Sequence, residues 1–424
     1  MSQIRIDSEI GRLRTVLVHE PGLEIENMTP ASAAESLYDD LLFLEPAQAE
    51  HRRLTQVLAR VAEVLQLLDL LADVLSDRNL RWRLVSRLCE LHACPELVPE
   101  LVELPARELA EQLLSGTPLR KDTLKRFLSA SRYALPPLPN AFFMRDATMC
   151  VNDRVIVGSM ATGVRQSEAI ILRAIFRHHP ALAGNGFYLD GTQKDAPSVT
   201  IEGGDVLVLR EDLLVIGYSE RTSADGIDVL LEALAKAGTV RDVVVVELPQ
   251  ARATIHLDMI FTMIDREHCV VYSPLVTEAR RCRAIHVRLG GGQVASIAAR
   301  VGLLEALEAL GLPLEPIACG GDDPLRQDRE QWASGANFFA LAPGKVIGYE
   351  RNRATFDALA KRGFRVVSAA DAASGAVDLE GPERVAIAMP GEELNRGGGG
   401  CRCMTLPIAR DAVNWAGARA VERS

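Results

Sequence analysis

The chain has 424 residues, 48% of them hydrophobic and 25% charged, which is enough apolar material for a large globular core. The formal net charge of −10 argues against a nucleic-acid-binding protein, and no uncharged apolar run is long enough to predict a membrane span. The N-terminal stretch has no apolar signal core, so we expect a cytoplasmic protein whose eight cysteines stay reduced.

A helical segment interrupts the first part of the chain. From about residue 45 to residue 128, apolar residues recur at three- and four-residue spacing and glycine is almost absent. The pattern predicts an inserted α-helical bundle of four or five helices, with Cys89 and Cys94 at core-like positions. Residues 1–44 and 129–424 would then form a separate α/β domain.

The rest of the chain repeats one plan of short β-rich runs and helices. "RDATMCVNDRVIVGSM", "EGGDVLVLREDLLVIGYSERT" and "HLDMIFTMIDREHCVVYSPL" each contain an aspartate and a hairpin with a polar turn, and Gly320–Asn352 resembles the second of them. "GRLRTVLVHEPG" is a degenerate fifth copy. A unit of roughly fifty residues repeated about five times predicts a propeller-like α/β ring whose polar ends converge on one axis.

Several polar residues fall at those ends. "PNAFFMRDA" contains Asn140, Phe143, Arg145 and Asp146; "IEGGD" contains Glu202; and "TIHLDMIF" contains His256 and Asp258. Alternation with apolar residues predicts that His256 and Asp258 share one face of a strand. Each residue also has an ordinary structural interpretation as a cap, a turn or a core histidine, and each is a weak signal by itself.

Convergence of three carboxylates on one buried place requires a cation among them. The histidine and cysteines lack zinc spacing, so a metal is the less favoured cation and a guanidinium, which binds carboxylates bidentately, fits better. A cysteine with a histidine partner is the natural nucleophile for the guanidinium carbon. In "NRGGGGCRCMTLP" the glycines would let the backbone bend and approach a planar group closely.

These motifs resemble the arginine deiminases of the guanidino-group-modifying, or pentein, superfamily. "PNAFFMRD", "EGGDV", "HLDMIFT" and "ELNRGGGGCRCM" occur in the family order, and "SEIGRLRTVLVHEPGLE", "YDDLLF", "REQW" and "GANFFALAPGKVIGYERN" also match. The resemblance covers nearly the whole chain, including the helical insertion. It implies a five-bladed ββαβ pseudo-symmetric propeller.

The resemblance also implies roles for individual residues. It makes Cys403 the nucleophile and gives Cys401 no catalytic role, and it makes His256 the general acid and base. Glu202 would be the carboxylate beside His256, and Asp146 and Asp258 would hold the guanidinium. The positions implied for the amino-acid end of the substrate are Asn140, Arg165, Arg221 and the main chain near Gly397, with Phe143 packed on the substrate stem.

The implied reaction is hydrolysis of L-arginine to citrulline and ammonia through a cysteine S-alkylthiouronium intermediate, with no metal or other cofactor. The expected partner is this small molecule, not a nucleic acid or a membrane. Gly398 stands where the family usually has an arginine, and Met144 stands in place of threonine. The first departure leaves open a deiminase of another guanidine; an amidinotransferase and an inactive binding protein are further alternatives. Formation of a homo-oligomer also stays open.

Overall fold

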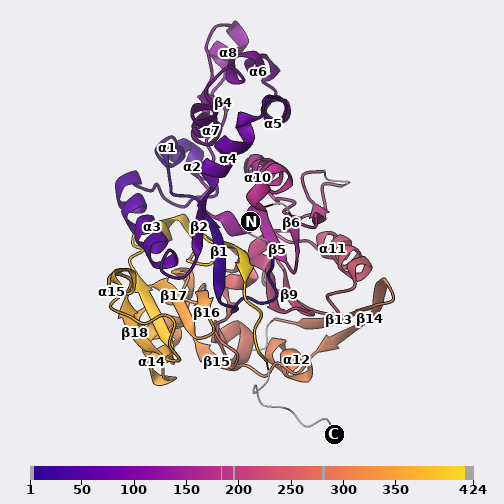
Figure 1. Cartoon of the computed structure of the whole chain (residues 1–424), viewed down its shortest axis with the longest axis vertical. Helices are drawn as coiled ribbons and strands as arrows, with labels where there is room; N and C mark the ends of the chain where they lie inside the picture. The colour runs from indigo at the N-terminus through magenta and orange to yellow at the C-terminus, as the bar shows by residue number, and fades with distance from the viewer. Residues whose placement is uncertain (1–3, 183, 194–195, 279–281, 416–424) are drawn as a thin grey trace.

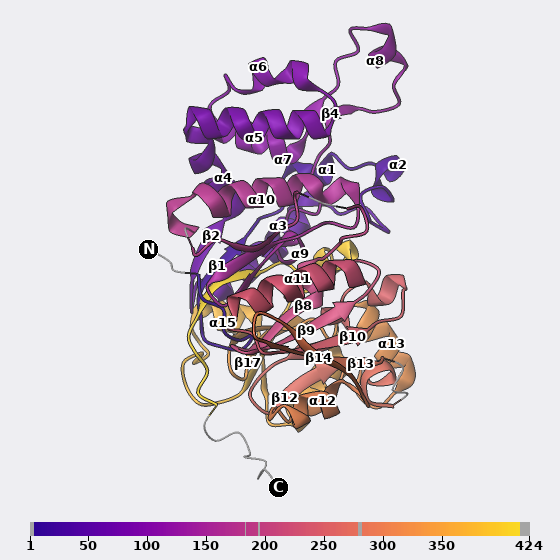
Figure 2. The ribbon, with the colours of Figure 1, turned by 90° about the vertical axis from the view of Figure 1, so that its right-hand side faces the viewer.

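The computed structural model describes residues 4–182, 184–193, 196–278 and 282–415. Figure 1 shows a mixed α/β body with a helical region projecting from one end, and Figure 2 shows the same helices stacked above the sheets. Within the described residues, helices that are both apolar and long enough to cross a bilayer are absent.

One plan recurs in five of the six sheets that the described residues form. Each has an antiparallel strand pair, which is a hairpin in four of the five sheets, and a further strand that lies parallel to one strand of the pair and is preceded by a helix. The clearest example is β5 (Thr148–Val151), β6 (Arg154–Val157), α10 (Gln166–His178) and β7 (Phe187–Asp190). The hairpins predicted from the repeats are therefore present.

The other sheets vary the plan. The largest has the order β14-β13-β10-β9-β8, because a second hairpin is added to its edge. Its elements are β8 (Val206–Arg210), β9 (Leu213–Tyr218), α11 (Ala224–Ala237), β10 (Asp242–Glu247), β13 (Ala284–Gly290) and β14 (Gln293–Arg300). The next sheet contains β11 (Phe261–Met263), β12 (His268–Val271), α12 (Leu303–Ala309) and β15 (Glu315–Ala318). The four-stranded sheet contains β16 (Phe339–Ala342), β17 (Lys345–Tyr349), α14 (Arg353–Lys361), β18 (Arg365–Ser368), α15 (Ala369–Ser374) and β19 (Val385–Met389).

The first sheet joins the two ends of the chain. β1 (Leu13–Val18) pairs antiparallel with β20 (Leu406–Arg410) and parallel with β2 (Glu63–Gln66), with α3 (Leu44–Leu58) between β1 and β2. The segment from α3 to β2 thus lies inside the range 45–128 that was expected to be the helical insertion. Because β2 pairs with β1, we propose that the insertion begins after Gln66.

The insertion is mainly helical and is attached to α10. Its elements are α4 (Leu67–Ser76), α5 (Arg78–Leu91), α6 (Val98–Leu101), α7 (Ala106–Ser115), α8 (Leu124–Leu128) and the two-stranded sheet of β3 (Thr117–Pro118) and β4 (Tyr133–Leu135). Both α4 and α5 pack on α10 (Figure 2), and Nε2 of His92 lies 2.8 Å from Oγ of Ser167 on α10. The expected burial of Cys89 and Cys94 is confirmed.

Three short elements hold or directly follow candidate site residues: α9 (Met144–Ala147) and the 3-10 turns Gly203–Asp205 and Leu257–Met259. The other short helices are α1 (Leu23–Glu26), α2 (Pro30–Ala33) and α13 (Pro324–Trp332). The prediction that His256 and Asp258 lie on a strand is wrong, because strand β11 begins only at Phe261. An extended His256 precedes the 3-10 turn that contains Asp258, so the two residues do not share one face of a strand.

Candidate active site

A narrow cavity of about 40 Å³ brings together residues from distant parts of the chain. It is lined by Leu37, Asn140, Phe143, Asp146, Arg165, Glu202, Arg221, Arg252, Ile255, His256, Met259, Gly397, Gly398, Gly399 and Cys403. Every site residue expected from the sequence therefore borders this cavity except Asp258, which is completely buried behind it.

The glycine run leads to Cys403 and leaves no room for side chains at Gly399 and Gly400. A Cβ atom on Gly399 would lie 2.4 Å from Cε1 of Phe143, and one on Gly400 would lie 2.5 Å from Oδ1 of Asn337. Gly398 has a φ angle of +87°, in the left-handed region that favours glycine. The run thus packs against Phe143, and Cys403 follows it in the wall of the cavity.

Cys403 is held by contacts from two other segments. Oδ1 of Asn337 accepts hydrogen bonds from the backbone N–H groups of Arg402 and Cys403, and it lies 3.5 Å from Sγ of Cys403. Sγ also lies 3.8 Å from Oδ2 of Asp258. Burial, reinforced by the carboxylates of Asp258 and Asp146, raises the pKa of the Cys403 thiol well above its usual value. The thiol is therefore protonated in the empty cavity.

His256 lines the same cavity as Cys403 and pairs with Glu202. Nε2 of His256 lies 3.0 Å from Oε2 of Glu202, and Nδ1 lies 3.8 Å from Oδ1 of Asp146. The ring fits because position 204 is glycine, where a Cβ atom would lie 2.4 Å from Nδ1. Burial by itself would lower the pKa of His256, but Asp146, Glu202 and Asp205 outweigh burial and raise the pKa to about 9. The imidazole is consequently a cation at neutral pH.

Asp258 belongs to a buried ion-pair network. Its Oδ2 accepts a hydrogen bond of 2.8 Å from Nη1 of Arg402, and the same guanidinium donates to both carboxylate oxygens of Glu9. Oδ1 of Asp258 is buried and has no hydrogen-bond partner among the described residues. An unpaired buried carboxylate oxygen is energetically unfavourable, so this atom is available to a ligand that reaches it.

Asp146 has a similar arrangement on α9. Its Oδ2 accepts a hydrogen bond of 2.5 Å from Nη1 of Arg165, whereas Oδ1 is buried and has no hydrogen-bond partner within the described part of the chain. The other nitrogens of Arg165 donate to Glu168 and to the carbonyl oxygens of Asn140 and Phe143. In this structure Arg165 therefore orients a carboxylate of the protein, with all three guanidinium nitrogens bonded.

The remaining expected binding residues lie on the rim of the cavity. The side-chain amide of Asn140 donates to the carbonyl oxygen of Ser36, and the ring of Phe143 covers Gly397 and Gly399. Arg221 is 5% exposed, and its Nε has no hydrogen-bond partner in the described ranges. A buried cation of this kind can bind an anionic group of a ligand.

Four residues of the site were not anticipated from the sequence. Asn337 holds Cys403, Glu9 and Arg402 hold Asp258, and Arg252 lines the mouth of the cavity. Glu9, Asn337 and Arg402 lie inside the quoted motifs, which did not indicate what these side chains contact, whereas Arg252 lies outside them, four residues before His256. The described residues contain no group of three or more histidine, cysteine, aspartate or glutamate side chains that could hold a metal ion.

Comparison with known proteins agrees with these motifs. The family model described as arginine deiminase matches residues 35–410. The arginine deiminase of Limosilactobacillus reuteri is 34% identical over 97% of this chain and 98% of its own length. The fold is similar to that of an amidinotransferase from Microseira wollei (14% identity, TM-score 0.56, covering 97% and 98% of the two chains) and to DDAH from Pseudomonas aeruginosa (14% identity, TM-score 0.50, covering 93% and 99%). The chain therefore belongs to the arginine deiminase family.

Proposed function

We propose that the protein hydrolyses L-arginine to L-citrulline and ammonia at the cavity around Cys403. Family membership supports this reaction. The observation that carries it is the pair of buried Oδ1 atoms of Asp146 and Asp258, which lack a hydrogen-bond partner among the described residues and belong to two carboxylates beside the same thiol. A planar guanidinium has donors on two edges and would satisfy both atoms while its carbon faces Sγ.

The fold supports the same proposal. We infer that the five sheets with the recurring hairpin, helix and parallel strand are the blades of a five-bladed propeller. β20 would complete the first blade by pairing with β1, which returns the end of the chain to its beginning. The segments that carry Asp146, Glu202, His256 and Cys403 would then meet near the central axis.

The first chemical step is attack by Cys403. The bound guanidinium is a cation, so it favours loss of the thiol proton to solvent and offsets the high pKa that burial gives to Cys403. The thiolate forms a bond to the guanidinium carbon. His256, already protonated, donates its proton to the departing nitrogen, and ammonia leaves with formation of the S-alkylthiouronium intermediate.

The second step is hydrolysis. His256, now neutral, accepts one proton from a water molecule that attacks the same carbon. The hydroxyl group formed on that carbon then loses its remaining proton to the departing sulfur as the carbon–sulfur bond breaks, which releases citrulline and regenerates the Cys403 thiol. Glu202 stabilises the protonated form of His256 in both steps through its 3.0 Å contact with Nε2. No redox step and no cofactor enter this scheme.

The amino-acid end of the substrate lies toward the rim. We propose that Arg221 attracts the carboxylate, that Asn140 and the main chain at Gly397 contact the polar groups, and that Phe143 packs on the alkyl stem. For Arg165 we propose a changed role, because its guanidinium donates to Asp146 and Glu168 in this structure. It fixes one oxygen of Asp146 and leaves the other for the substrate.

A product assay tests the proposal. Purified protein incubated with L-arginine should release ammonia and citrulline in equal amounts, with no change when an amine such as glycine is added. Transfer of the amidino group to the added amine, with formation of ornithine, would instead establish an amidinotransferase. Absence of turnover with arginine but turnover of a substituted guanidine would establish a different deiminase, and absence of both would indicate a binding protein.

A further inference from the structure

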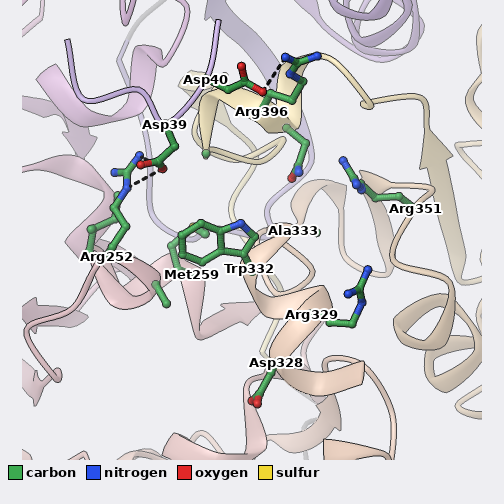
Figure 3. A pocket seen from close by; sticks show the side chains of 14 residues that line it. Asp39, Asp40, Arg252, Met259, Asp328, Arg329, Trp332, Ala333, Arg351 and Arg396 are labelled. Carbon is green, nitrogen blue, oxygen red and sulfur yellow. Dashed lines mark hydrogen bonds and ion pairs between the residues drawn. The ribbon is translucent and has the colours of Figure 1, made fainter. Parts of the chain in front are cut away.

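An outer cavity of about 580 Å³ adjoins the catalytic cavity. Arg252, Ile255, Met259 and Gly398 line both, so the two spaces are separated only by this shared wall. Figure 3 shows the outer cavity, with Arg252 on one side above Met259 and beside Trp332, and with Arg329 and Arg351 on the opposite side. Arg252 thus stands where a molecule passes from the outer cavity to the thiol.

The other cations near this wall either have carboxylate partners or, like Arg221, whose Nε has no hydrogen-bond partner among the described residues, line only the catalytic cavity. Arg165 donates from every guanidinium nitrogen to protein oxygens, and Arg402 is completely buried between Glu9 and Asp258. Arg396 is paired with Asp40 at 2.6 Å and borders only the outer cavity. The side chain of Arg252 is 35% exposed and reaches the catalytic cavity as well.

The guanidinium of Arg252 lies over Gly398. A Cβ atom built on Gly398 would have Nη2 of Arg252 as its neighbour at 3.5 Å, and this is its closest contact within 4 Å. The glycine therefore leaves open space that the end of Arg252 borders. A positive charge is present at this position of the rim although residue 398 has no side chain.

The present partner of Arg252 is itself a carboxylate. Nη2 and Nε donate to Oδ2 of Asp39 at 2.9 and 3.1 Å, and Nη2 also donates to the carbonyl oxygen of Leu37. Asp39 is 61% exposed, and an ion pair in such a setting contributes little to stability. A substrate carboxylate can therefore replace Asp39 with a small net change in free energy, because one carboxylate replaces another.

We propose that Arg252, together with Arg221 deeper in the catalytic cavity, binds the carboxylate of the substrate, and that Arg252 at the mouth thereby contributes to specificity for guanidines that carry a carboxylate. The inference rests on the proposed function, since it assigns a group of the substrate to the wall of the same site. Asp39 holds Arg252 in place while the cavity is empty and gives up the guanidinium when substrate enters.

Kinetics with arginine and with agmatine, which lacks the carboxylate, tests this role. We expect Arg252→Ala to raise KM for arginine about tenfold to a hundredfold, the effect of one lost charge-assisted contact, with kcat little changed. KM for agmatine, or its inhibition constant if it is not turned over, should stay as in the wild type. Arg252→Lys should keep part of the affinity for arginine. Arg329→Ala is the matched control, because Arg329 lines only the outer cavity and should leave both constants unchanged.

Asp39→Asn tests whether Asp39 competes with the substrate for Arg252 or forms a purely structural ion pair with it. If Asp39 competes with the substrate for Arg252, the variant should lower KM for arginine. A rise in KM like that of Arg252→Ala, an equal effect of Arg252→Ala on arginine and agmatine, or a loss of kcat with both, would overturn the inference and make the ion pair structural. If the wild type releases no citrulline from arginine, the proposed function itself fails; if it does and Arg252→Ala does not discriminate, only the role of Arg252 fails.

Discussion

Nε2 of His256 lies 3.0 Å from Oε2 of Glu202, and both side chains are buried. The pair has a clear electrostatic consequence, since Glu202 and Asp146 keep the imidazole protonated against the effect of burial. An imidazole that is protonated at neutral pH can serve as the acid that protonates the leaving nitrogen.

The first prediction concerns the pH dependence of kcat/KM. The pKa of His256 is raised to about 9, so the protonated form predominates below that pH and is lost as pH rises through it. We expect kcat/KM for arginine to fall above about pH 9. In Glu202→Gln the alkaline limb should move to lower pH, because the neutral amide no longer stabilises the imidazolium. An unchanged alkaline limb in this variant would show that His256 is not the group that protonates the leaving nitrogen.

The second prediction distinguishes the two cysteines near the C-terminus. Cys403 lines the cavity, whereas Cys401 is completely buried and burial raises the pKa of its thiol. Cys403→Ser should abolish citrulline formation, and Cys401→Ser should keep most of it. Both substitutions change one sulfur atom to oxygen, so each is the control for the other. An active Cys403→Ser enzyme would exclude the assigned nucleophile.

The third prediction concerns stability. Arg402→Met would leave Glu9 and Asp258 buried without their cation, and breaking a buried pair in this way costs about 3–5 kcal/mol. We expect that decrease in the free energy of unfolding, measured with denaturant. Arg14→Met is the control: the ion pair between Arg14 and Asp411 is exposed, and such pairs contribute about 0–1 kcal/mol. Equal losses in both variants would show that the buried network has no special weight.

The fourth prediction is that metal removal has no effect. The cation at the carboxylates is proposed to be the substrate, so dialysis against a chelator should leave kcat and KM unchanged when thiols are kept reduced. A metal present in stoichiometric amount, and lost together with activity, would contradict the cofactor-free scheme.

Much of the fold was predictable because its signals are local. Hairpins such as β5–β6 and β8–β9 have short polar turns between apolar runs, and the insertion helices have a clear three- and four-residue period. The pairing of β1 with β20 was not predictable in this way, since it joins strands at opposite ends of the chain. The placement of β2 beside β1 was also not predictable, because α3 separates the two strands along the chain and continues the helical pattern of the expected insertion.

The candidate site likewise contains residues that could be predicted from local motifs and residues that could not. Residues such as Glu202 and Cys403 stand in motifs, beside glycines that make sense only if something approaches them closely. Asn337 also stands in a quoted motif, "GANFFALAPGKVIGYERN", but nothing in that motif indicates that its side chain reaches Cys403. The pairing of Glu9 with Arg402 depends on contact across 393 positions of sequence. Side-chain contacts of this kind follow from the assembled fold and leave no periodic trace in the sequence.

Mass spectrometry of acid-quenched turnover tests the central claim most directly. During reaction with arginine labelled at the guanidinium carbon, the peptide that contains Cys403 should gain the mass of arginine less ammonia, and the label should then pass to citrulline. The accumulation should increase in a variant slow in the hydrolytic step. Labelled citrulline formed without any labelled Cys403 peptide, or label on another residue, would contradict the account.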